Sequence, residues 1–167
     1  SNDWPTIGLD YAETRFSKLN QINADNVKKL GLVWSYPLES SRGVEATPVV
    51  VDGIMYQTAS WSVVHAIDAR TGKRLWTFDP KGDREKGDGV ALWKGKVFVV
   101  AYDGRLIALG AVTGKVVWEK DTVVSKEHSY TITGAPRVFN GKVIIGNGGA
   151  EYGARGYVTA YDAETGN

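Results

Sequence analysis

The chain of 167 residues has no cysteine, one methionine and two histidines. Without cysteine it has no disulfide, no thiol nucleophile and no cysteine metal site. Its net charge is +1, and no basic cluster indicates a nucleic-acid surface. No apolar run reaches the roughly 20 residues that a membrane-spanning helix needs. We therefore expect no nucleic-acid partner and no membrane span, and no signal peptide is visible.

Tryptophans recur at a fixed distance along the chain. Trp34, Trp76 and Trp118 are each separated by 42 residues, and the last two end the same motif, Ala-x-x-Ala-x-Thr-Gly-Lys-x-x-Trp. The motif begins a third time at Ala160. A period of roughly 40–45 residues with β patterning is typical of propeller blades.

Each period predicts four strands. Residues 47–58 are two β-rich runs joined by Asp52-Gly53, a strong signal for a hairpin. The same pattern returns at residues 91–100 and 137–145. A third strand then leads into the Ala-x-Asp-Ala-x-Thr-Gly turn, where glycine supplies a positive φ and Asp or Thr caps the backbone. The tryptophan strand comes last, and its indole is expected to dock the sheet against the next one.

The predicted fold class is therefore all-β, with blades of four antiparallel strands and about three and a half blades in this chain. We predict one partial β-propeller domain over residues 1–167. Its irregular lead-in, residues 1–30, contains a short helical turn within residues 22–30, capped by Asn23 or Asp25. Residues 81–88 are charged and glycine-rich and predict an exposed loop. The blade-like units are expected at about 31–76, 77–118 and 119–167.

The third unit is longer by about ten residues, between Gly146 and Gly156. This stretch has five glycines and one acid, Glu151. Glycines let a backbone approach a ligand closely, and a carboxylate beside them can hold a hard cation such as Ca²⁺. From residue types alone, Glu151 is either a metal ligand or a solvated surface residue.

Five segments together resemble a known family. The chain is similar to the N-terminal portion of the quinoprotein alcohol dehydrogenases, eight-bladed propellers that use pyrroloquinoline quinone (PQQ). The resemblance covers nearly the whole chain and is specific because the segments occur together. They are Asp-Trp-Pro-Thr at 3–6, Asp-Tyr-Ala-Glu-Thr-Arg-Phe-Ser at 10–17, Arg-Gly-Val-Glu-Ala-Thr-Pro at 42–48, Tyr-Thr-Ile-Thr-Gly-Ala-Pro-Arg at 130–137 and Gly-Gly-Ala-Glu-Tyr-Gly-Ala-Arg-Gly-Tyr at 148–157.

The resemblance implies a role for six residues. Glu45 would hydrogen-bond the quinone cofactor, and Thr133 would contact one of its carboxylates. Without the resemblance, Glu45 is an acid facing the channel and Thr133 an ordinary strand residue. Glu151 would ligate Ca²⁺ or a lanthanide. The backbone that approaches the cofactor carboxylates would be that of Gly148, Gly149 and Ala150.

The resemblance also implies a reaction. The metal would polarise a quinone carbonyl, and hydride would pass from a primary alcohol to the quinone once an aspartate took the hydroxyl proton. That aspartate lies in later blades of the family, so this chain holds no catalytic residue and is expected to be inactive alone. An alcohol, a cytochrome c acceptor and a periplasmic location follow from the family in the same way.

Two departures from the family keep another function open. The stretch from Asp79 to Gly89 is short and lacks the family's adjacent cysteines, and Asp88 stands where the family has an arginine. An anion near a tricarboxylate would weaken cofactor binding. The alternative is a non-catalytic propeller scaffold, or a truncated or engineered chain, that self-associates. Unpaired blade edges favour self-association in either case.

Overall fold

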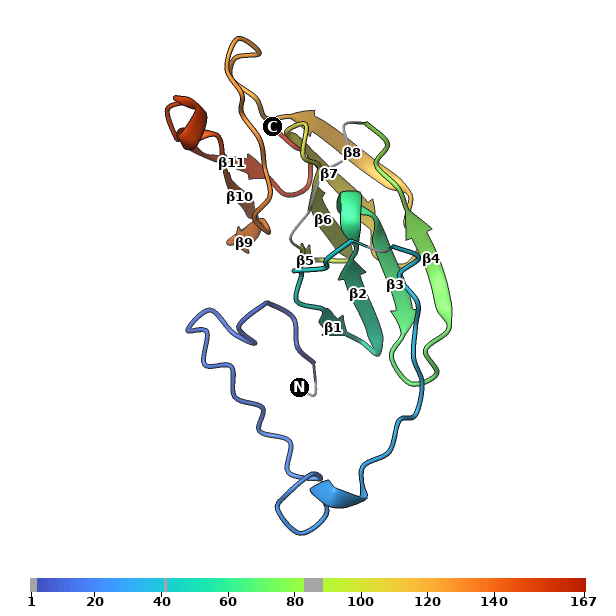
Figure 1. Ribbon diagram of the computed structural model, residues 1–167. Coiled ribbons are helices and arrows are strands. Elements are labelled where there is room, and N and C mark those ends of the chain that lie inside the picture. The colour runs from blue at the N-terminus through green and yellow to red at the C-terminus, as the bar shows by residue number, and fades with distance from the viewer. Residues whose placement is uncertain (1–2, 41, 83–88) are drawn as a thin grey trace.

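The computed structural model describes residues 3–40, 42–82 and 89–167. Strands in that part of the chain form three antiparallel sheets (Figure 1), and it contains no α-helix. This confirms the all-β fold with four-stranded sheets. The sheets are β1 (Val49–Val51), β2 (Ile54–Thr58), β3 (Val64–Asp68) and β4 (Arg74–Phe78); β5 (Val90–Trp93), β6 (Lys96–Val100), β7 (Arg105–Gly110) and β8 (Val116–Asp121); and β9 (Arg137–Phe139), β10 (Lys142–Gly146) and β11 (Val158–Asp162).

The hairpin turns adopt the conformation that their sequences predict. Asp52 and Gly53 have φ angles of 51° and 76°, and the two strands of this hairpin pair with Val51 opposite Ile54. Positive φ at both central residues is the type I′ turn, whose twist matches that of the flanking strands. Lys94-Gly95 and Asn140-Gly141 repeat the same pair of positive angles.

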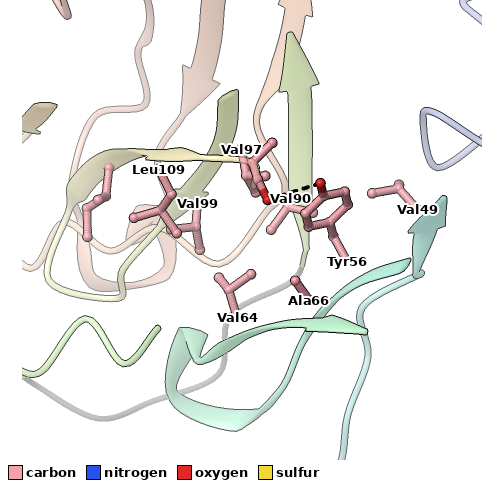
Figure 2. Close-up of a cluster of buried hydrophobic side chains, with 10 residues drawn as sticks. Val49, Tyr56, Val64, Ala66, Val90, Val97, Val99 and Leu109 are labelled. Atoms are coloured by element: carbon pink, nitrogen blue, oxygen red, sulfur yellow. Dashed lines mark hydrogen bonds between the residues drawn. The ribbon is translucent and has the colours of Figure 1, made fainter. Parts of the chain in front are cut away.

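Consecutive sheets pack face to face through alternating side chains. In β6, Val97 and Val99 point toward the first sheet, where they join Tyr56 and Val64 in a buried cluster (Figure 2). Phe98, between them, points the other way into a second cluster shared with β10. Because side chains alternate along a strand, one apolar strand serves two interfaces.

The recurring tryptophans dock each sheet onto the next, as expected. The Nε1 of Trp76 donates a 2.9 Å hydrogen bond to the carbonyl oxygen of Ala111, in the turn of the second sheet. Trp118 makes the same bond to Ala163 of the third sheet, at 3.3 Å. Trp34, which lies outside any assigned strand, makes it to the first sheet. One residue in each period therefore sets the contact between neighbouring sheets.

The turn that contacts each tryptophan is stabilised by hydrogen bonds within the turn itself. The Asp68 Oδ1 accepts hydrogen bonds from the backbone N–H groups of Thr71 and Arg70, at 2.8 and 3.0 Å. The bond from Thr71 is the main cause that lowers the pKa of the Asp68 carboxyl. In the second sheet Gly110 replaces this aspartate, yet the Gly114 N–H still donates to its carbonyl at 2.8 Å. The aspartate is therefore not required for the turn to form.

The lead-in runs along the first sheet before leaving it. Trp4 pairs with Val50 of β1 through two 2.8 Å backbone hydrogen bonds, and the chain then loops out to the 3₁₀ turn η1 (Val27–Lys29) (Figure 1). The short helical turn is confirmed. The predicted cap is wrong, because Asn26 takes the N-cap position and makes no side-chain capping bond there. No helix in the described ranges is long and apolar enough to cross a bilayer.

Candidate functional site

The first strands of the three sheets begin close together. A β-carbon placed at Gly89, just before β5, would lie 3.4 Å from the Cβ of Ala135 and 3.9 Å from that of Ala46. Glu45 immediately precedes Ala46, and Thr133 lies two residues before Ala135; both are exposed. The structure therefore brings the segments of these two predicted residues to one place, although they are 88 positions apart in the sequence.

The glycine-rich loop joins the same region through one backbone contact. The N–H of Gly148 donates a 2.7 Å hydrogen bond to the carbonyl oxygen of Thr131, two residues before Thr133. The loop continues into the 3₁₀ turn η3 (Ala150–Tyr152), which carries the exposed side chain of Glu151. The segments that hold all six predicted residues thus meet through Gly89 and through the hydrogen bond between Gly148 and Thr131.

The glycines of this loop are explained by contacts within the chain. A β-carbon at Gly149 would lie 2.2 Å from the carbonyl oxygen of Ser129, and the φ of Gly149 is 109°. At Gly148 it would lie 2.9 Å from the Thr131 Oγ1. Contacts with Ser129 and Thr131 therefore already favour glycine at both positions, and the Gly148 N–H is donated to Thr131.

The glycine-rich loop alone supplies few ligands to a cation. In the described part of the chain, no group of three or more His, Cys, Asp or Glu side chains could hold a metal ion. Glu151 is the single acid of the glycine-rich loop. Because Ca²⁺ takes six to eight oxygen ligands, most of a metal's ligands would have to come from outside this loop.

Arg42, a cation that the sequence analysis did not single out, lies on the same segment as Glu45. The Arg42 guanidinium sits 5.9 Å from the ring centroid of Trp61, which has an unusual positive φ of 66° in the 3₁₀ turn η2 (Ser60–Ser62). An arginine over an indole face is held by cation–π attraction. The position of Arg42, three residues before Glu45, is the one signal that the sequence offers for it.

Asp88 and most of the predicted exposed loop lie outside the described residues, which stop at Gly82 and resume at Gly89. The segment that leads into this gap is held from the second sheet. Arg105 donates a 3.0 Å hydrogen bond to the carbonyl oxygen of Pro80 and another to that of Lys81, while it pairs with Asp103.

A separate hollow lies in the described part of the chain. It measures about 360 Å³ between the lead-in, β5 and β9, and is lined by Ile7, Leu92 and Val138 among others. Tyr11 also lines it and donates a 2.7 Å hydrogen bond to the Val138 carbonyl oxygen. None of the six predicted residues lines this hollow.

Known proteins share both the sequence and the fold. A family model described as "PQQ: Glucose/ethanol/alcohol dehydrogenase, beta-propeller domain" matches residues 4–167. The chain belongs to this family. It is 71% identical to the quinohemoprotein alcohol dehydrogenase of Comamonas testosteroni over 98% of its length, but spans 24% of that relative. A solved structure of the Comamonas testosteroni enzyme superposes with a TM-score of 0.95, at 70% identity, over 99% of this chain and 26% of that one.

Two further family relatives carry different names. The 1-butanol dehydrogenase (cytochrome c) of Thauera butanivorans is 64% identical over 96% of this chain and 24% of its own length. A solved europium-containing methanol dehydrogenase superposes with a TM-score of 0.92 at 38% identity, over 99% of this chain and 31% of that one. This PQQ-family chain therefore spans about a quarter of the curated relatives it matches.

Proposed function

We propose that the chain forms one side of a PQQ and metal site in a dehydrogenase that oxidises primary alcohols. One observation carries the proposal: the segments of Glu45 and Thr133 both approach Gly89, and a hydrogen bond joins the Thr133 segment to the loop of Glu151, in a chain that matches the PQQ family over residues 4–167. The family match indicates PQQ as the cofactor, and the fold brings the three segments together.

The exposed side chains fit such a cofactor in part. The Thr133 hydroxyl can donate to a carboxylate and the Glu45 carboxylate can accept from a ring N–H. Arg42 adds a positive charge on the same segment as Glu45, which favours a tricarboxylate. Glu151 would supply one oxygen ligand to Ca²⁺ or a lanthanide. Gly148, Gly149 and Ala150 would border the carboxylates, although the N–H of Gly148 is donated to Thr131.

PQQ when bound accepts a hydride equivalent from the alcohol. The residues of this chain would hold and orient it and would leave proton removal to groups outside the chain. We therefore expect no alcohol oxidation by a polypeptide of these 167 residues. The names of the relatives support an alcohol as substrate and cytochrome c as acceptor for a full-length enzyme. A periplasmic location is inferred from the family resemblance.

An absorbance titration of PQQ into the purified chain tests the proposal. With Ca²⁺ present we expect saturable binding that a chelator reverses, because the carboxylates of the cofactor and Glu151 would share the cation. A second titration with Eu³⁺ in place of Ca²⁺ measures which class of cation supports tighter PQQ binding. Absence of saturable binding with either cation would contradict the proposal and leave the non-catalytic scaffold as the better description.

A further inference from the structure

One side chain joins the two ends of the glycine-rich loop, which leaves the third sheet between β10 and β11 (Figure 1). The backbone pairing of these strands ends at Gly146 and Val158. Just beyond that pair, the Asn147 Oδ1 accepts a 2.8 Å hydrogen bond from the N–H of Tyr157. The Asn147 Nδ2 also donates a 2.8 Å bond to the carbonyl oxygen of Gly148. Asn147 therefore holds the base of the loop closed where the strand pairing stops.

The base of the loop is also fastened to the second sheet. The Tyr157 hydroxyl donates a 3.0 Å hydrogen bond to the carbonyl oxygen of Thr122, which directly follows β8. Thr122 is buried, and its own hydroxyl donates a 2.7 Å bond to the carbonyl oxygen of Gly104. Tyr157 is therefore held by a residue that is itself fixed, and the loop has a defined place relative to two sheets.

The far half of the loop is supported by Tyr130. Its hydroxyl donates a 3.2 Å hydrogen bond to the carbonyl oxygen of Arg155. Its ring lies edge-on to that of Tyr157, with the ring centroids 5.2 Å apart. Side chains therefore hold the loop at its base and along its return to β11.

This loop depends on such support because of its composition. Five glycines among residues 146–156 give the backbone many accessible conformations, and ordering them has an entropic cost. Glu151 lies within this stretch, and its side chain is exposed. The position of the Glu151 carboxylate therefore depends on the backbone that carries it, and that backbone depends on the bonds at the base of the loop.

We propose that Asn147 is a positioning residue for Glu151, and that Tyr157 assists it by fastening the loop to Thr122. The inference rests on the proposed function, in which Glu151 is a metal ligand. Asn147 has no contact with the cation in this role and acts through the backbone of the loop. Residues that orient a metal ligand typically change metal affinity by roughly 10–100-fold when they are removed.

The PQQ titration with Ca²⁺ measures this effect. Asn147→Ala should weaken the Ca²⁺-dependent affinity by roughly tenfold or more. The midpoint of thermal unfolding should stay close to that of the parent, because Asn147 belongs to neither buried cluster. In a chain that already carries Glu151→Gln, Asn147→Ala should cause little further loss, because both changes act on the same ligand. Equal losses in the two backgrounds would show that Asn147 acts independently of Glu151 and would overturn the proposal.

Proteolysis tests the same role without a cofactor. Arg155 is exposed and lies in the loop, so trypsin can cut after it when the loop opens. Mass spectrometry identifies that cut among the others. We expect cleavage after Arg155 to be roughly tenfold or more faster in Asn147→Ala than in the parent. Tyr157→Phe keeps the ring beside Tyr130 and removes one hydrogen bond, so it should accelerate the cut by a smaller factor.

Asn26→Ala is the matched control. The Asn26 side chain also makes two hydrogen bonds to the backbone of a loop, accepting from the Asn23 N–H at 2.9 Å and donating to the Gln21 carbonyl oxygen at 2.7 Å. It lies in the lead-in, so this variant should bind PQQ like the parent and be cut after Arg155 at the parent's rate.

The outcomes separate this inference from the proposed function. If the parent binds PQQ with Ca²⁺ and Asn147→Ala binds equally tightly, the role of Asn147 is wrong and the proposed function stands. If the parent shows no binding, the proposed function is wrong and this role is wrong with it. Equal rates of cleavage after Arg155 in parent and variant would show that Asn147 does not hold the loop, and would also overturn the proposal.

Discussion

The Nε1 of Trp76 donates a hydrogen bond to the carbonyl oxygen of Ala111 and thereby joins one sheet to the turn of the next. The indole lies so close to that turn that a β-carbon at Gly114 would be 2.6 Å from Cδ2 of its ring. The bond and the glycine recur where Trp118 meets Ala163 and Gly166. A tryptophan and the turn glycine of the next sheet, 38 residues later for Trp76 and 48 for Trp118, therefore form one unit of this architecture.

The first prediction concerns this glycine. Gly114→Ala should lower the free energy of unfolding by about 2–4 kcal/mol, because it adds a steric conflict with Trp76 to the cost of a positive φ for alanine. Gly95→Ala is the matched control: its φ is 74° and its β-carbon would have nothing within 4 Å. It should cost only about 1–2 kcal/mol. Urea unfolding measures the free energy of unfolding of both variants. Equal losses of stability would show that the contact with the Trp76 ring contributes nothing.

The second prediction concerns the core. Phe98 is fully buried between the second and third sheets, and Phe98→Ala should cost about 3–5 kcal/mol because it opens a cavity. Phe16→Ala, in the lead-in, should cost about 0.5 kcal/mol or less, since that ring is 72% exposed. Thermal unfolding compares the two, and a small loss at Phe98 would mean that the sheets do not pack as described.

The third prediction concerns pH. His65 is buried with its Nδ1 3.0 Å from the Tyr36 hydroxyl and 3.3 Å from that of Thr77, while its Nε2 has no partner among the described residues. Burial lowers the pKa of His65; Glu39 opposes this shift, and Arg74 adds to it. The unfolded chain therefore takes up a proton first as the pH falls through about 6.5, and stability is lost below that value.

The loss from this histidine should approach at most about 1.4 kcal/mol per pH unit, the limit for one proton. Urea midpoints measured between pH 8 and 5 should be level above pH 7 and fall below it. His65→Gln should flatten that fall, whereas the exposed His128→Gln should leave it unchanged. A parent whose midpoint is constant over this range would contradict the role of His65.

Most of the fold could be predicted because it is local and repeated. Asp52-Gly53 determines a hairpin within four residues. The Trp76 motif recurs at a constant distance, so the strands predicted in one period can be checked against the next. The cap of η1 was predicted wrongly for a local reason. Asn23 and Asn26 bond to each other, the Asn23 N–H donating to the Asn26 Oδ1 at 2.9 Å, and this places the turn later in the chain.

The candidate site was harder to predict because it depends on distant contacts. Nothing local indicates that Gly89 would bring Ala46 and Ala135 together, since this follows from how three sheets pack. The glycines at 148 and 149 had a local signal, but the pattern could not show that Gly148 approaches Thr131 and Gly149 approaches Ser129. The role of Glu151 depends on oxygen ligands outside its own loop, so it remains a prediction.

The most direct test compares the parent with Glu151→Gln in the same PQQ titration with Ca²⁺. Glutamine keeps the size of the side chain and removes its negative charge, so we expect at least a tenfold weaker Ca²⁺-dependent affinity with an unchanged fold. Glu127→Gln, at another exposed loop position, should bind like the parent. If Glu151→Gln bound PQQ and Ca²⁺ as tightly as the parent, the assignment of this side of the metal site would be wrong.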